Sequence, residues 1–152
     1  MKRLLFTLAT CCVMCACEQK TEMNPFFTEF QTEYGAPDFT KIRLEHYEPA
    51  FLKGIEEQNA EIKAIVDNPE EPTFENTIVA LDKSGGILAR VSGVFFALTE
   101  ADTNDSLTAL NEKMAPVLSE HSDNIYLNQD LYKRVADVHQ QEKEGKDRKS
   151  VV

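Results

Sequence analysis

The chain has 152 residues, of which 42% are hydrophobic, so it is long enough for one domain and too short for two ordinary ones. Acidic residues outnumber basic residues 26 to 16, and the formal net charge is −10 at pH 7. This charge repels phosphate backbones, so we expect no nucleic-acid partner.

Residues 1–16 have the pattern of an export signal, with positive residues first, then a mostly apolar run and small residues at the end. The stretch Met14-Cys15-Ala16-Cys17, followed by polar residues, resembles a bacterial lipobox, in which Cys17 receives the lipid. We therefore predict a lipoprotein signal peptide over 1–16, a lipid anchor on Cys17 and a polar linker over 17–23. The protein would then be an exported periplasmic or outer-membrane lipoprotein attached to the membrane. An ordinary cleaved signal with incidental cysteines is the alternative, since Met14 is an unusual lipobox residue.

The body begins with an arm and a first helix. Residues 24–40 mix five aromatic side chains with proline and glycine, which predicts an arm or loop docked through its aromatics. Helical periodicity then extends from about Leu44 to Val66, where Pro49 fits only near the first turn. The prolines of the segment 67–72 end this helix.

Three further helices are expected. Thr73 can cap the second helix, in which Gly85-Gly86 indicates a kink or a close helix crossing. Its expected apolar side consists of Phe74, Ile78, Leu81, Leu88, Val91 and Phe95.

Residues 104–106 offer caps for the third helix, whose apolar stripe is broken only by His121 and which Pro116 should kink. Asn128 can start the fourth helix, with Leu131, Val135 and Val138 on one side. No alternating pattern is present, so we predict an all-α fold of about four helices joined by short loops.

Three histidines are the candidates for metal chemistry, and each has a simpler explanation. A zinc peptidase uses His-Glu-x-x-His, but no histidine of this chain has another four residues away. His139 and Glu142 could share a helix face, which we interpret as a solvated polar face. His121 is expected to be hydrogen-bonded and partly buried, and His46 to be a surface residue at a helix start. We therefore predict no catalytic and no metal-binding residue in this chain.

Several blocks in order resemble the N-terminal helical region of bacterial dipeptidyl carboxypeptidases, in the thimet oligopeptidase family of zinc metallopeptidases. The blocks are Asn24-Pro25-Phe26-Phe27, His46-Tyr47-Glu48-Pro49-Ala50-Phe51, Pro72-Thr73-Phe74-Glu75-Asn76-Thr77-Ile78, Val94-Phe95-Phe96-Ala97-Leu98-Thr99 with Thr103-Asn104-Asp105, and Asn124-Ile125-Tyr126-Leu127-Asn128 with Leu131-Tyr132. The resemblance covers residues 24–141.

The resemblance implies a much longer helical enzyme, in which an N-terminal lid faces a C-terminal zinc domain across a deep channel. That enzyme removes C-terminal dipeptides from oligopeptides, and its zinc lies on a His-Glu-x-x-His motif. Residues 24–141 would form a helical lid segment that walls the channel, and the chain would be inactive without the missing C-terminal catalytic domain. The alternative is a complete small helical lipoprotein that acts as a binding or scaffold module.

Residues 142–152 form a polar tail, and its last six residues carry a separate signal. Asp147-Arg148-Lys149-Ser150-Val151-Val152 is the translation of a widely used sequencing adapter up to a stop codon. We therefore expect that the reading frame passes from a gene into adapter sequence at 147–152. A natural basic tail is the alternative.

Overall fold

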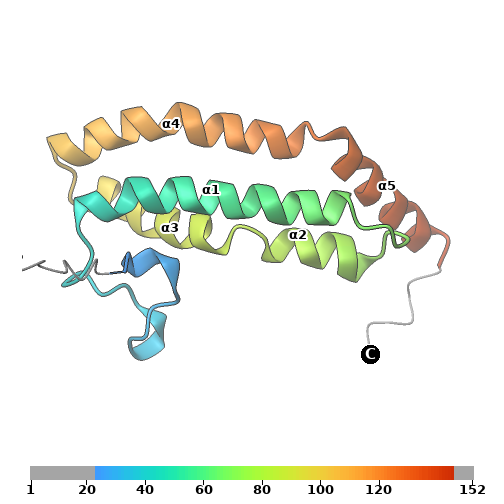
Figure 1. The fold of residues 1–152 in the computed structure, drawn as a ribbon, viewed down its shortest axis with the longest axis horizontal. Helices are drawn as coiled ribbons and strands as arrows, with labels where there is room; N and C mark the ends of the chain where they lie inside the picture. The colour runs from blue at the N-terminus through green and yellow to red at the C-terminus, as the bar shows by residue number, and fades with distance from the viewer. Residues whose placement is uncertain (1–22, 146–152) are drawn as a thin grey trace, which may run out of the picture.

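The computed structural model describes residues 23–145 (Figure 1). The expectations for the signal peptide, the Cys17 anchor and the end of the polar tail lie outside the described residues. Within this range the chain is all-α, as predicted, and has no strand. Its four α-helices of 15 or more residues are α1 (Leu44–Val66), α3 (Gly86–Ala101), α4 (Asp105–Tyr126) and α5 (Gln129–Lys143). A short α2 (Ala80–Lys83) continues a π-helical stretch, Phe74–Val79, and 3-10 turns form at Pro25–Phe27 and Glu33–Gly35.

Helix α1 is the centre of the bundle and contacts all four of the other α-helices. Figure 1 shows α4 along one side of α1, α3 and α2 along the other, and α5 at the end where α1 stops. Ten buried residues form a large cluster, here called the arm-end cluster, between the arm, α1, α3 and α4. A smaller α5-end cluster of three buried residues, Ile62, Ile65 and Leu131, joins α1 to α5.

Side-chain caps begin three of these helical segments, as the sequence predicts. The Asn104 Oδ1 accepts backbone N–H bonds at 3.1 and 3.0 Å at the start of α4, and Asn128 Oδ1 does the same at the start of α5. Thr73 Oγ1 accepts an N–H bond at 3.1 Å at the start of the π-helical stretch. Each cap satisfies donors that the helix itself leaves unpaired, which is worth about 1 kcal/mol.

One expected detail of these helices is wrong. The apolar spacing predicts that Phe74 faces the core, but Phe74 is 44% exposed, and Thr77 is fully buried instead. The reason is the π-helical turn, which changes the angular step between residues and so rotates a different side chain towards the core. Pro49 lies close to the first turn of α1, as expected. Helix α4 continues through Pro116, and the kink expected there stays a prediction.

The glycine pair produces the expected interruption, which separates α2 from α3. Gly85 has a φ of +75°, a left-handed conformation that favours glycine, and its N–H donates to Glu61 Oε2 at 2.7 Å. Close helix contact occurs nearby at a different glycine. A Cβ on Gly54 of α1 would lie 2.7 Å from the backbone nitrogen of Leu88 in α3. Glycine at position 54 therefore sets the short separation of α1 and α3.

The arm docks through part of its aromatic set. Phe26 is fully buried, and its carbonyl accepts a bond from Arg90 Nη1 at 2.8 Å. Asn24 Nδ2 donates to the carbonyl of His46 at 2.7 Å and ties the arm to the first turn of α1. Tyr34 and Phe39 remain exposed at 96% and 56%. The prediction of a docked arm is confirmed at Phe26 and is wrong at these two residues.

Arg134 fixes α5 to the loop that follows α1. It is buried, and its Nη1 donates to the carbonyl of Asn68 at 2.8 Å, while its Nη2 donates to Asn76 Oδ1 at 3.3 Å. The guanidinium thus supplies donors to a turn that contains prolines and has few of its own.

Within residues 23–145, no helix is both long and apolar enough to cross a membrane.

Candidate functional site

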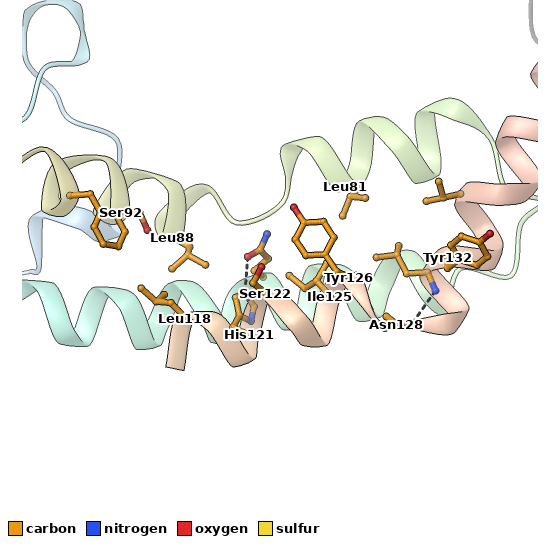
Figure 2. A pocket seen from close by; sticks show the side chains of 14 residues that line it. Leu81, Leu88, Ser92, Leu118, His121, Ser122, Ile125, Tyr126, Asn128 and Tyr132 are labelled. Carbon is orange, nitrogen blue, oxygen red and sulfur yellow. Dashed lines mark hydrogen bonds between the residues drawn. The ribbon is translucent and has the colours of Figure 1, made fainter. Parts of the chain in front are cut away.

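A groove of about 620 Å³ lies between the α2–α3 pair and the α4–α5 pair, with α1 beneath it. Figure 2 shows side chains from both walls directed into this space, with Leu88 facing Leu118 and Leu81 near Tyr126. The lining is mainly apolar, and apolar side chains come from every wall: Leu81, Leu88, Phe96, Leu118, Ile125 and Val135. The groove exists because α2 and α3 pack on α1 at one side while α4 and α5 pack on it at the other.

A polar bridge crosses the floor of this groove. Gln58 of α1 donates from Nε2 to Ser84 Oγ at 3.2 Å, and its Oε1 lies 2.7 Å from His121 Nε2. Ser84 Oγ in turn donates to the carbonyl of Leu81 at 2.8 Å, so it accepts from Gln58. The Gln58 oxygen therefore faces His121, and His121 Nε2–H is the donor.

Electrostatics keep this bridge neutral. Burial lowers the pKa of the His121 imidazole below its ordinary value, because the charged form would lose hydration. The nearby Glu61 carboxylate accepts the Gly85 N–H at the start of α3, where the helix dipole favours a negative charge. The Gly85–Glu61 bond and the Gln58–Ser84 bond together hold the α2–α3 break against α1 and so fix one wall of the groove.

The histidines singled out in the sequence do not come together. His121 is 6% exposed and hydrogen-bonded, as predicted. His46 is half-buried in the first turn of α1, where its Nδ1 accepts the Arg43 N–H at 3.1 Å. His139 and Glu142 are exposed on α5, which confirms the solvated face. Among residues 23–145 no group of three or more His, Cys, Asp or Glu side chains could hold a metal ion.

Sequence reasoning missed the residues that give the groove its character. Gln58 was not a candidate, because a single glutamine on a polar helix side carries no signal of its partners on two other helices. Tyr126 and Tyr132 are 83% and 66% exposed at the mouth of the groove. The exposure of two large aromatic side chains beside an apolar groove follows from the packing of α4 and α5 and not from a motif.

Comparison with known proteins identifies relatives of the chain by sequence identity. No protein-family model matches the chain. It is 47% identical over 132 residues to the dipeptidyl carboxypeptidase of Escherichia coli strain K12, a match that covers 86% of this chain and 19% of the relative. The chain is homologous to one segment of the dipeptidyl carboxypeptidases.

Other relatives agree with this assignment. The dipeptidyl carboxypeptidase of Salmonella typhimurium is 46% identical over 118 residues, which are 78% of this chain and 17% of the relative. Oligopeptidase A of Escherichia coli is more distant, at 28% identity over 115 residues, or 76% of this chain and 16% of the relative. The chain thus spans less than a fifth of the length of the dipeptidyl carboxypeptidases it matches, so the similarity concerns one part of those longer proteins.

Proposed function

We propose that residues 24–141 form the non-catalytic N-terminal helical segment of a zinc peptidase that removes C-terminal dipeptides from oligopeptides. The observation that carries this proposal is the 47% identity to a dipeptidyl carboxypeptidase over nearly the whole described bundle. At this identity, we infer that the segment keeps the fold of the matched part of the relative.

The chemistry of the described residues agrees with a supporting role. The buried imidazole of His121 is bonded to Gln58, and the other two histidines lie on different parts of the bundle surface. The donor set that zinc catalysis needs, three protein ligands around one ion, does not fit these positions. Metal binding and bond cleavage would therefore depend on the part of the peptidase that this chain does not match.

Within such an enzyme, we assign this bundle to a wall of the substrate channel. A channel wall excludes substrates that are too bulky to enter, so it needs rigid helices more than reactive groups. The central α1, packed against four other helices, provides that rigidity. The wall would admit oligopeptides and exclude folded proteins.

A chimeric enzyme tests the proposal. Residues 24–141 of this chain would replace the matched segment of the Escherichia coli dipeptidyl carboxypeptidase, with a deletion of that segment as the control. We expect the chimera to release C-terminal dipeptides from oligopeptides with a kcat within about tenfold of the parent, because the reacting groups are unchanged. The deletion should lose this activity or begin to accept larger substrates. A folded chimera without dipeptide release would refute the proposed function.

A further inference from the structure

The groove between the α2–α3 pair and the α4–α5 pair is an apolar surface with exposed aromatic side chains. Tyr126 is 83% exposed, Tyr132 is 66% exposed and Phe96 is 40% exposed, and all three line the same groove of about 620 Å³. Exposed aromatic side chains that gather along one apolar groove, rather than lying singly over the surface, are typical of interaction sites. The question is which kind of occupant the groove fits.

The shape of the groove suits a helix. Two helical walls run along it above a helical floor, and α4 contributes Leu118, Ser122 and Ile125, which are spaced by four and three residues on one side of the helix. The lined part of α4, from Leu118 to Tyr126, is about 12 Å long at the helical rise of about 1.5 Å per residue. An occupant helix of two to three turns would fill that length, with its side chains between the ridges of the walls.

The polar groups of the groove disfavour an extended peptide. An extended peptide must find partners for its own backbone N–H and C=O groups, whereas a helix satisfies them internally. Gln58 and His121 are already bonded to each other, and Asn128 Oδ1 is used in capping α5. The hydroxyls of Ser92, Ser122, Tyr126 and Tyr132 also line the groove, but its helical walls present no strand edge with which an extended backbone could pair.

The charge around the groove indicates which charged residues should flank the apolar stripe of the occupant. Exposed charged residues adjoin lining residues on both walls: Asp82 follows Leu81 in α2, Asp123 follows Ser122 in α4 and Lys133 follows Tyr132 in α5, so acidic residues are in the majority. The chain as a whole is acidic, with a formal net charge of −10. A helix with an apolar stripe and basic flanks would complement this surface.

We propose that the groove holds an amphipathic, basic-flanked helix from the part of the peptidase that lies beyond the segment matched here. The inference rests on the proposed function, because it takes the chain to be one part of a longer polypeptide. Its direct support is the length comparison, since the match covers 19% of the Escherichia coli relative and leaves four-fifths of that protein to pack around it. The apolar groove on the matched segment is where such packing would occur.

Thiol accessibility in the full-length chimera tests this docking site. Tyr126→Cys places a thiol in the groove, and Leu127→Cys places one at the neighbouring residue, which is 72% exposed and does not line the groove. Each protein would be treated with a thiol reagent, and modification of the peptide that contains the introduced cysteine would be followed by mass spectrometry. We expect the Tyr126→Cys thiol to react at least tenfold more slowly in the chimera than in this chain alone, while Leu127→Cys reacts alike in both.

A stability measurement complements the accessibility test. Tyr126→Lys combined with Tyr132→Lys should lower the melting temperature of the chimera more than that of this chain alone, because both tyrosines are exposed in the chain. Leu127→Lys should leave the melting temperature of both proteins unchanged. Equal effects of the double substitution in chimera and chain would overturn the docking site.

The possible outcomes separate this inference from the proposed function. An active chimera in which Tyr126→Cys stays reactive would overturn the docking site and leave the function standing. A folded but inactive chimera with a protected Tyr126→Cys thiol would overturn the proposed function and leave the docking site standing. Protection of this chain alone that disappears on dilution would point to a second copy, and protection only with added oligopeptide would point to substrate; either result overturns the inference. Cysteines at the aligned positions of the natural Escherichia coli enzyme give the same measurement where the chimera does not fold.

Discussion

Replacing Gly54 with alanine should destabilise the bundle, although the same change usually stabilises a helix. In a helix interior alanine is favoured over glycine by about 1 kcal/mol. At this position, however, the new Cβ would lie 2.7 Å from the Leu88 nitrogen and 2.9 Å from its Cα. These are backbone atoms of α3, so the clash cannot be relieved by turning a side chain.

The expected magnitude follows from the two opposing effects. Relief requires α1 and α3 to separate by up to about 1 Å, since ordinary contacts between carbon atoms are about 3.5–4.0 Å. Overpacking of this kind costs about 1–3 kcal/mol, and a clash with backbone belongs at the upper end of that range. After subtracting the helix gain, we expect a net loss of about 1–2 kcal/mol, or roughly 4–8 °C in melting temperature.

Gly93 provides a matched control within α3. A Cβ at this exposed position has no neighbour within 4 Å among the described residues. Gly93→Ala should therefore raise the free energy of unfolding by up to about 1 kcal/mol. Circular dichroism of both variants and the parent, followed through thermal and urea unfolding, gives the comparison. If Gly54→Ala were as stable as the parent or more stable, the close packing of α1 and α3 inferred from the backbone would be wrong.

Three further outcomes are expected. The free energy of unfolding should fall as the pH drops below 6.5, because burial lowers the pKa of His121 and the unfolded chain therefore binds its proton at a higher pH. His121→Asn should remove this part of the pH dependence, and an unchanged slope would contradict the assignment. Arg134→Met should cost about 1–3 kcal/mol in urea unfolding because it leaves the partly buried acceptors of Asn68 and Asn76 without this donor, and Arg134→Lys should recover part of the loss. Full stability of the methionine variant would argue against this anchoring role. We also propose that Cys17 carries the lipid, so Cys17→Ser should move the protein out of the membrane fraction and Cys15→Ser should not; a lipid-labelled, membrane-bound Cys17→Ser protein would refute it.

The helices could be predicted because their signals are local. Apolar spacing and a proline-rich ending place α1 at Leu44–Val66, and the cap at Asn104 marks the start of α4. The interruption at Gly85 was also visible, since two adjacent glycines oppose a continuous helix. The exposure of Phe74 could not be foreseen, because its pattern fits an α-helix and the chain forms a π-helical turn there.

The candidate site was less accessible to sequence reasoning because its contacts are distant in the chain. His121 was expected to have a hydrogen-bond partner, but Gln58 lies 63 positions away on another helix. The close approach at Gly54 likewise depends on Leu88, and a glycine in an amphipathic helix does not reveal which helix passes over it. Family resemblance was carried by ordered blocks of residues, and it identified the relatives without locating the groove.

The two hydrophobic clusters imply that the bundle does not have one uniform stability. Ten buried residues hold the arm end, whereas three hold α5 to α1 at the other end. Local opening requires less free energy where fewer apolar contacts are broken, so amide hydrogens of α5 should exchange with solvent before those of α1 and α3. Tyr132 and Val135 form part of the groove on this weaker helix. A helix seated in the groove would therefore add order to α5 as well as affinity, and folding of this end would be coupled to assembly of the larger protein.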